Sequence, residues 1–533
     1  MLRLSSRAVH GQGAKTLVLV IVALLAALVL RDWIIEGTFD SLNLRVLGAA
    51  LVVVAVFILG NWRRGLFLFL FWLVIEDLPR KYLGNNMFMF FGKDILALIV
   101  YLAFSLALLE RRTRSFRPPF LVPLLIFAGV GLIQVFNPQS PSLLYGALGI
   151  KLYFYYAPLM FVGYALVQTE RDLSQFLQFN VLLGAIVAVL GVIQGVVGFS
   201  FMNPEELAPE LRGLGQLTRY APESKQALIR PTSVFVSDSR FAWYILLIFI
   251  LSIGLAGYQI FRAIPWRKLT FLVLGVTGVA LVISGVRGCF VYGTGSLVVL
   301  LVAMLWGSPH RGPGHVRFAT MIRRSAVMLS LAVAAMAVVF PEEIGARWNF
   351  YYETMAFSSP HSELVSRVRD YPLDNLMVAL EFPNWPVGYG IGTASLGVQY
   401  VNRVLGGVRP PVFAVENGYG SLLLEMGIPG LLTWIFWTTA ALVAGWRVVK
   451  RLKGTHLFPV GFSIFWFAFV LLFPMTYGGL FAYQNYVLNA YLWLLLGVLF
   501  RLPALLEVGN LRFARAEGNA TTTAGHQPEA NGR

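Results

Sequence analysis

Long apolar runs separated by short polar connections make up most of the chain. A helix of about 20 apolar residues crosses the roughly 30 Å hydrocarbon core of a bilayer, and most of the runs approach this length. The runs cover 16–35, 44–60, 64–76, 94–109, 119–136, 150–167, 176–198, 241–261, 269–286, 288–306, 325–341, 419–446, 458–477 and 486–502. Several are short or contain glycine and proline, so two or three are candidates for tilted or re-entrant segments. The pattern predicts an all-α polytopic membrane protein with 12 to 14 transmembrane helices.

Composition and charge support this class and exclude others. Of the 533 residues, 57% are hydrophobic and only 13% are charged, a balance that soluble globular proteins do not show. The single cysteine, Cys289, excludes a disulfide framework and a cysteine zinc cluster. The formal net charge of +16 comes mostly from short basic clusters between apolar runs. Such clusters indicate membrane topology, and we expect no nucleic-acid partner.

The same basic clusters predict the orientation of the chain, because positively charged loops are retained in the cytoplasm. The clusters begin at Arg3, Arg63, Arg111, Arg262, Arg311 and Arg447. They alternate with uncharged or acidic connections and place both termini in the cytoplasm. Arg80, Lys81 and Lys93 fall on the wrong side in this scheme.

Two long connections, 200–240 and 342–418, are expected on the external face. The second is long enough to form a small cap, and its tryptophans and tyrosines suit a membrane interface or a platform for sugar rings. We expect four regions in the chain. They are an N-terminal transmembrane bundle (1–229), a core (230–450) that includes the cap, C-terminal transmembrane helices (451–502) and a cytoplasmic tail (503–533) predicted to be disordered from its composition.

Several arginines could bind an anion at the external face. Arg287 lies between two apolar runs, where an ionised guanidinium is costly unless it is paired or lines a watery cavity. The alternative is that it marks a helix end and snorkels to the interface. Arg367 and Arg369 lie two residues apart in the cap, so one could face the membrane cavity while the other pairs with Asp370. Arg230 and Arg240 flank the segment before the span 241–261. Either could contact a lipid phosphate or serve as an interfacial anchor.

Acidic and amide side chains follow a glycine-rich turn, 388–393. Glu416 and Asn417 precede the apolar run 419–446, and Glu425 interrupts its apolar face two turns later. Glu416 is a candidate general base, or alternatively a helix cap. Glu425 is expected to be protonated or paired at membrane depth, or to act as structural glue. Phosphate-binding loops, metalloprotease and hydrolase motifs and D-x-D pairs are all missing from the sequence, so we expect no metal and no cofactor.

Over roughly 230–450, these segments resemble the O-antigen ligase and O-antigen polymerase superfamily. The resemblance rests on the order of four features: Arg287 shortly after Ser284, a long external loop, Arg367 or Arg369 upstream of the turn 386–390, and the helix-opening segment 416–430. It implies a GT-C-like fold in the bacterial inner membrane with a periplasmic helical cap. The activity it implies is metal-independent transfer of a glycan from undecaprenyl diphosphate to an acceptor sugar hydroxyl.

The resemblance also implies roles for individual residues. Arg287 and Arg369, with Arg367 as the alternative, would bind the diphosphate. The family has a histidine before Asn417, and this chain has Glu416 there. This departure favours a polymerase over a ligase, and His361 in the cap is a rival base. The remaining expected substrate contacts are Arg230, Arg240, Asn417 and His361. The expected partners are the lipid-linked glycan, an acceptor glycan or glycolipid, membrane lipid and a candidate chain-length regulator.

Two other functions stay open from the sequence. A polyprenyl-phosphosugar-dependent, mannosyltransferase-like enzyme would use acids of the first external loop, where Asp32, Glu36 and Asp40 occur at four-residue spacing. A glycolipid flippase or transporter would fit the number of spans, although the halves of the sequence show no internal repeat. A flippase needs cationic residues along most of the bilayer, whereas the transferase needs them only at the external mouth.

Overall fold

The computed structural model describes residues 53–83, 87–110, 116–204, 218–262, 267–307, 338–406 and 415–524, and a few single residues between them. The described part of the chain is mostly helical (77%), which confirms the prediction of an all-α membrane protein. Its strands, among the described residues, are β1 (Thr218–Tyr220) and β2 (Ala227–Ile229). They form an antiparallel hairpin in which Thr218 lies opposite Ile229.

The chain divides into two compact units. Unit 1 contains Met1–Leu73 and Phe91–Thr113, and unit 2 contains Val74–Phe90 and Arg114–Arg533. Most of α3 (Trp62–Ile75) and α5 (Met87–Leu109) belongs to unit 1, where the rings of Trp62 and Phe104 pack edge to face at 5.3 Å. Unit 2 holds all the residues discussed below. The acidic triplet Asp32, Glu36 and Asp40 lies outside the described residues.

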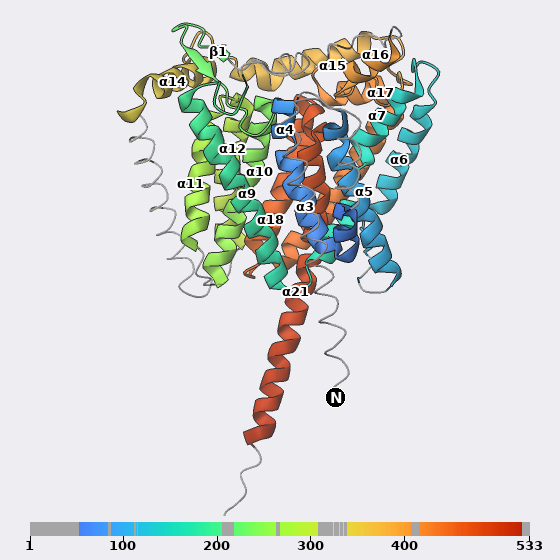
Figure 1. Cartoon of the computed structure of the whole chain (residues 1–533), viewed down its shortest axis with the longest axis vertical. Helices are drawn as coiled ribbons and strands as arrows, with labels where there is room; N and C mark the ends of the chain where they lie inside the picture. Colours follow the sequence, from blue (N-terminus) through green and yellow to red (C-terminus); the bar gives the residue numbers. More distant parts are fainter. Residues whose placement is uncertain are drawn as a thin grey trace, which may run out of the picture. The chain divides into compact units, whose positions relative to one another are not determined.

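Seven helices in the described part of the chain are long and apolar enough to cross a membrane (Figure 1). They coincide with seven of the predicted runs and confirm a membrane-embedded protein. They are Phe91–Leu109 of α5, α9 (Glu170–Val197), α10 (Asp238–Arg262), α12 (Arg287–Gly307), α17 (Gly418–Leu452), the segment Phe458–Gly478 made of α18 (Phe458–Val470), η2 (Leu471–Met475) and α19 (Thr476–Gly478), and Tyr486–Glu507 of α21 (Tyr486–Ala524).

Other predicted spans take a different form. α6 (Leu121–Val135) and α11 (Arg267–Ile283) are apolar but shorter, and α3 has 14 residues. The run 150–167 is divided between α7 (Leu143–Phe154) and α8 (Leu159–Leu166), because Pro158 has no N–H to continue the helix before it. The run 16–35 and most of 44–60 and 325–341 lie outside the described residues. α21 continues to Ala524, into the tail predicted to be disordered.

Helix α10 is the centre of unit 2. It packs against α9, α11, α12 and α18, and 94% of its span is buried. Glycines allow other helices to approach closely, as at the contact of α8 with α21. A Cβ atom added to Gly163 would collide with the carbonyl oxygen of Leu494, and one added to Gly497 with that of Met160. Small residues at such contacts are typical of helices that pack within lipid.

One end of unit 2 carries the helices of the predicted cap. α14 (Pro341–Met355), α15 (Tyr371–Glu381) and α16 (Val398–Leu405) lie there with the β1–β2 hairpin and α4 (Asp77–Leu83), whereas α21 projects from the opposite end (Figure 1). The π-helical turn η1 (Ser366–Asp370) leads into α15, and the short α20 (Phe481–Gln484) precedes α21. We call these the cap end and the basic end.

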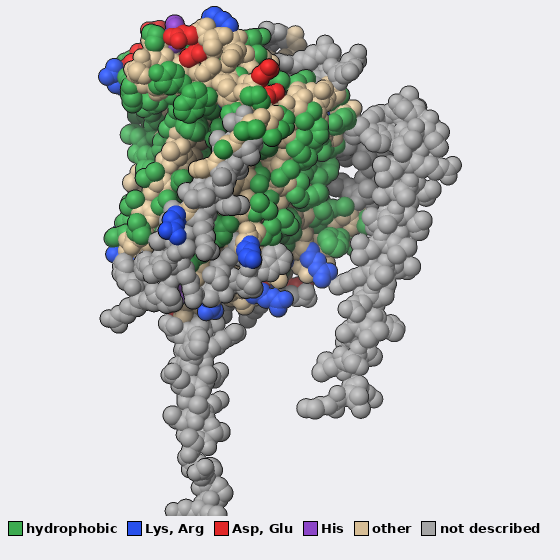
Figure 2. All heavy atoms as spheres, turned by 90° about the vertical axis from the view of Figure 1, so that its left-hand side faces the viewer, with side chains coloured by type: hydrophobic (Ala, Val, Ile, Leu, Met, Phe, Trp, Pro, Cys, Tyr) green, Lys and Arg blue, Asp and Glu red, His purple; other side chains and the backbone are tan. Residues whose placement is uncertain are grey.

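The polar side chains of unit 2 follow this division. On the face shown in Figure 2, hydrophobic side chains cover the middle, acids, bases and histidine gather at the cap end, and lysines and arginines lie toward the other end. Exposed apolar residues such as Leu272, Val298 and Leu305 belong to the helices α11 and α12 of this face. An apolar belt between two polar ends is the surface that a bilayer requires.

Candidate functional site

Arg287, Glu363 and Arg367 form an open ion cluster at the cap end. A terminal nitrogen of Arg287 and Nε of Arg367 each lie 3.1 Å from the same oxygen, Oε2 of Glu363. Arg287 is the first residue of α12, and Arg367 lies in η1, so the fold joins a span to the cap here. The three side chains are 24%, 41% and 51% exposed in chain order, and water therefore reaches the cluster. We call these three residues the cap ion cluster.

Aromatic rings orient both arginines of the cap ion cluster. The Arg287 guanidinium lies 5.6 Å from the ring centroid of Phe350, and that of Arg367 lies 4.8 Å from the centroid of Tyr371. A guanidinium held over a ring loses less freedom when it binds an anion. Burial raises the pKa of Glu363, but the hydrogen bonds and charges of the two arginines outweigh it and hold this pKa below its ordinary value. The cluster therefore carries a net positive charge at neutral pH.

Arg230 lies beside the cap ion cluster. Its side chain is 11% exposed and donates a 3.0 Å hydrogen bond to Oδ2 of Asp238. Burial lowers the pKa of Arg230, Asp238 opposes this effect, and the positive charges of Arg219 and Arg287 lower the pKa further. These electrostatic effects place Arg230 near Arg287 but commit its guanidinium to Asp238. Because Asp238 neutralises it, Arg230 adds little net charge to the cluster.

Tyr371 connects Arg367 to Glu416. Burial raises the pKa of the Tyr371 phenol, and the adjacent carboxylate of Glu416 raises it further. Glu416 is exposed, and its backbone N–H donates to Oδ1 of Asn375 at 2.8 Å. The candidate base thus lies one aromatic side chain away from the cap ion cluster, with its carboxylate open to solvent.

The helix-capping role, one of two open for Glu416, belongs to Asn417. Its Oδ1 accepts hydrogen bonds from the N–H groups of Tyr419 and Gly420 at 2.8 and 2.9 Å, which caps α17. Its Nδ2 donates to the carbonyl of Pro372 at 2.9 Å, and the side chain is buried. The amide of Asn417 is therefore fully used inside the protein, and it positions Glu416.

Two other candidates of the cap lie outside the cap ion cluster. Nε of Arg369 donates to Oδ1 of Asp370 at 2.6 Å, and the side chain is 70% exposed. Of the two cap arginines, Arg369 is thus the one that pairs with Asp370. Nε2 of His361 lies 3.6 Å from Oε1 of Glu223 in the turn of the β hairpin and is half exposed. His361 therefore faces Glu223 of the hairpin.

Arg240 belongs to a different ion cluster, which joins the start of α10 to α4. Nη1 of Arg240 lies 2.7 Å from Oδ2 of Asp77, and Nη1 of Arg80 lies 2.6 Å from Oδ1 of the same carboxylate. Asp77 is 0%, Arg80 1% and Arg240 25% exposed, so the carboxylate itself is buried. We call Asp77, Arg80 and Arg240 the buried ion cluster. Its location explains why Arg80 departs from the charge pattern of the loops, since it pairs inside the protein.

Lys81, the neighbour of this cluster in the sequence, is also internal. Its Nζ donates to the carbonyl of Ser233 at 2.6 Å and to Oγ1 of Thr232 at 2.9 Å. Burial lowers the pKa of Lys81 to about 7, although the charge of Asp77 opposes this shift. Lys81 therefore fastens α4 to the segment before α10, and does not act as a topological signal.

The glycine-rich turn lies inside unit 2 against a break in α17. Gly427 has a φ of +67°, and Pro429 has no N–H for the carbonyl of Glu425. The turn supplies the missing donors, because the N–H groups of Tyr389 and Gly390 donate to the carbonyls of Leu424 and Glu425 at 2.7 and 3.0 Å. These hydrogen bonds between the glycine-rich turn and the break at Gly427 hold the cap segment against α17.

Glu425 is the polar centre of this contact. Its carboxylate is buried and accepts hydrogen bonds from the Tyr153 hydroxyl at 2.7 Å, the Ser395 hydroxyl at 2.6 Å and the Ala394 N–H at 3.1 Å. Gln484 donates in turn to Ser395 at 2.9 Å. Of the alternatives for Glu425, the structure favours the paired, structural one.

Sequence reasoning missed Glu363 and the buried Arg347, and it included Tyr371 only among the aromatic residues of the cap. Glu363 and Arg367 are four residues apart, a spacing typical of helical ion pairs that could have identified Glu363. Arg347 donates to the carbonyls of Gly195 at 2.8 Å and Ile229 at 3.2 Å, so it fastens α14 to α9 and the hairpin. No local pattern distinguishes such a buried arginine from an exposed one.

The described residues offer no group of three or more histidine, cysteine or acidic side chains placed to hold a metal ion. Comparison of the sequence with models of protein families gives no match, and comparison with curated proteins gives none.

Proposed function

We propose that the protein is a membrane glycosyltransferase that moves a glycan from an undecaprenyl-diphosphate carrier to an acceptor sugar hydroxyl at the cap end. The observation that carries this proposal is the shared oxygen of Glu363, which two arginines from distant segments contact at 3.1 Å each. Two guanidinium groups converging on one exposed carboxylate oxygen are also spaced to bind the oxygens of a diphosphate.

The chemistry follows from the charges. The acceptor oxygen forms a bond to the anomeric carbon, the bond from that carbon to the diphosphate oxygen breaks, and undecaprenyl diphosphate leaves. Arg287 and Arg367 stabilise the negative charge that develops on the leaving oxygen, as preorganised donors do in other enzymes. Glu416 accepts the proton of the attacking hydroxyl. Attack from the face opposite the leaving group inverts the anomeric configuration, and no metal ion is required.

The proposed function also specifies the membrane arrangement of the chain and its acceptor. We place the chain in a bacterial inner membrane, with 12 to 14 transmembrane helices in a GT-C-like arrangement, both termini in the cytoplasm and the cap in the periplasm. Glu416 in place of a histidine favours a polysaccharide polymerase over an O-antigen ligase. The acceptor is then a glycan or glycolipid, bound beneath the aromatic residues of the cap, and a chain-length regulator is a candidate partner.

Charge positions favour a transferase over a flippase. A flippase needs cations along most of the bilayer, whereas basic residues in the described spans lie toward span ends. These residues are Lys93, Arg171, Arg240, Arg262, Arg287, Arg447, Lys450, Arg451 and Arg501.

Reconstituted protein and synthetic undecaprenyl-diphosphate oligosaccharide provide the test. We expect glycan transfer with and without a chelator, and its loss in Arg287→Ala and Glu416→Gln, measured by mass spectrometry of the glycan products. Arg403→Ala is the matched control, because Arg403 is an exposed cap arginine on α16 that stacks on Tyr400. Transfer that survives in Arg287→Ala, or that requires a divalent ion, would contradict the proposal.

A further inference from the structure

A cavity opens between α9, α10 and α11, in the half of unit 2 toward the basic end. Its volume is about 260 Å³, several times the roughly 30 Å³ that one water occupies in the liquid. Apolar side chains form most of its wall, and two of them, Leu182 and Leu269, are 51% and 38% exposed. The cavity therefore opens toward the apolar surface, where lipid surrounds the protein.

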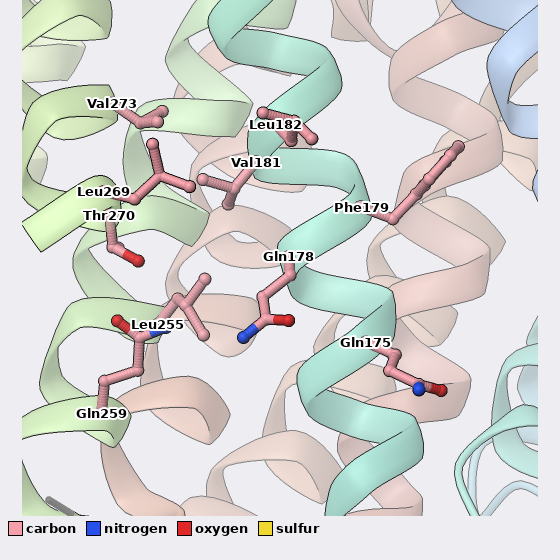
Figure 3. A pocket seen from close by; sticks show the side chains of 10 residues that line it. All are labelled: Gln175, Gln178, Phe179, Val181, Leu182, Leu255, Gln259, Leu269, Thr270 and Val273. Atoms are coloured by element: carbon pink, nitrogen blue, oxygen red, sulfur yellow. The ribbon is translucent and has the colours of Figure 1, made fainter. Parts of the chain in front are cut away.

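Uncharged polar side chains line the interior of this cavity. Figure 3 shows the amides of Gln178 and Gln259 and the hydroxyl of Thr270 directed toward one space, with the amide of Gln175 pointing away from them. Gln259 is 0% exposed, and neither its Oε1 nor its Nε2 has a hydrogen-bond partner among the described residues. A buried amide with both atoms unpaired is rare in a folded protein, so it points to a missing occupant.

The depth of these groups identifies the chemistry of that occupant. Gln259 lies three residues before Arg262 at the end of α10, an axial distance of about 4.5 Å in a helix. Thr270 lies two residues after the exposed Lys268 near the start of α11. A diacyl phospholipid has the same order of groups, with a phosphate at the surface and ester carbonyls just inside it. The carbonyls need neutral donors at this depth.

We propose that the cavity binds one diacyl phospholipid, whose ester carbonyls accept hydrogen bonds from Gln259, Gln178 and Thr270. Its phosphate lies at the level of Lys268, and an acyl chain packs against Leu182 and Leu269. The site lies on the opposite half of unit 2 from the cap ion cluster, so it does not depend on the proposed transferase activity.

Two lipids that differ only at the linkage test this site. The full-length protein in detergent is incubated with an equal mixture of ester-linked and ether-linked phosphatidylglycerol of the same chain length, and the retained lipid is counted by mass spectrometry. We expect the wild type to retain the ester lipid at least about 3- to 10-fold better, because the loss of even one of the three hydrogen bonds accounts for that ratio. Equal retention of the two lipids, or retention of neither, would overturn the proposal.

Substitutions in the cavity wall test whether the lipid binds in this cavity. Gln259→Leu should remove the ester preference, and Gln175→Leu, the matched control, should keep it, because the amide of Gln175 points away from the shared space (Figure 3). Thr270→Val keeps the shape of the side chain and provides a second test if Gln259→Leu does not fold. An unchanged ester preference in both Gln259→Leu and Thr270→Val would exclude this cavity as the lipid site.

Discussion

The cap ion cluster and the buried ion cluster share one motif in two settings. In each, two arginines from separate segments contact a single carboxylate, Glu363 in the first and Asp77 in the second. The two clusters differ in how far the carboxylate is exposed to water. Glu363 is 41% exposed and Asp77 is 0% exposed.

Solvent exposure decides what each carboxylate does. Asp77 also accepts a hydrogen bond from the N–H of Val236 at 3.3 Å, and this buried carboxylate compensates the buried guanidinium of Arg80 and the partly exposed one of Arg240. Removing such a partner strands buried charge. Glu363 neutralises arginines that water also reaches, and an exposed ion pair contributes little to stability. In the proposed function a diphosphate would displace Glu363 from its arginines, whereas Asp77 is enclosed and meets no such competitor.

The largest predicted effect is on stability. Asp77→Ala leaves Arg80 and Arg240 without their carboxylate, and we expect a loss of about 3–5 kcal/mol in the free energy of unfolding. Thermal unfolding in detergent, followed by size-exclusion chromatography, measures this loss. Glu363→Ala is the matched control, with an expected loss of about 1 kcal/mol or less. Equal losses of unfolding free energy in the two variants would mean that solvent exposure does not determine how much each carboxylate stabilises the fold.

A second prediction concerns catalysis. Arg287→Lys keeps the positive charge but removes the planar pair of donors, and we expect kcat to fall about 10²- to 10³-fold in the reconstituted transfer assay. Arg369→Lys should leave the rate unchanged, because Arg369 pairs with Asp370 at the surface. The reverse ranking of the two variants would assign the diphosphate to Arg369.

A third prediction uses the lowered pKa of Lys81. Between its folded pKa of about 7 and its ordinary value of 10.5, the unfolded chain binds the extra proton, so folded-state stability rises with pH. The stability of the wild type relative to Lys81→Met should therefore increase by about 2 kcal/mol from pH 7 to pH 9. Unfolding transitions at both pH values measure it. Lys450→Met, at an exposed lysine, should show no such change, and a flat difference for Lys81→Met would contradict a lowered pKa.

The smallest predicted effect is a gain of affinity. Glu363→Gln removes the charge that competes with a diphosphate for Arg287 and Arg367, and KM for the lipid-linked glycan should fall about two- to fivefold. Initial rates at varied substrate concentration measure this change. Glu381→Gln, at an exposed acid at the end of α15, is the control. A rise in KM would show that Glu363 contacts the substrate and does not compete with it.

Many elements of the fold could be predicted from apolar periodicity. The runs 176–198, 241–261 and 288–306 appear as α9, α10 and α12, because a long apolar segment in lipid must satisfy its backbone groups within one helix. The division of 150–167 was the chief difference, although Pro158 marks it in the sequence. The glycine-rich turn was recognised as a turn, but its partner, the break at Gly427, depends on contacts that local sequence does not contain.

The candidate site was predictable only in part. Arg287 and Glu416 stand out in the sequence because each borders an apolar run, where charge is costly, and Arg367 was a candidate only as the alternative to Arg369. Glu363, whose oxygen contacts both arginines, was not identified from the sequence, because an acid in a polar loop is ordinary. Arg230 and Arg240 looked alike in sequence, yet the first lies beside the cap ion cluster and the second pairs with Asp77.

The sequence by itself determined that this protein is a helical membrane protein with cationic residues at the ends of its spans, because hydropathy and charge are local properties of the chain. Only the tertiary structure decided which arginine meets which acid and whether water reaches the pair. Those outcomes depend on distances between segments far apart in the chain. The same residue types therefore form one ion cluster around the buried Asp77 of α4 and another around the exposed Glu363 at the cap.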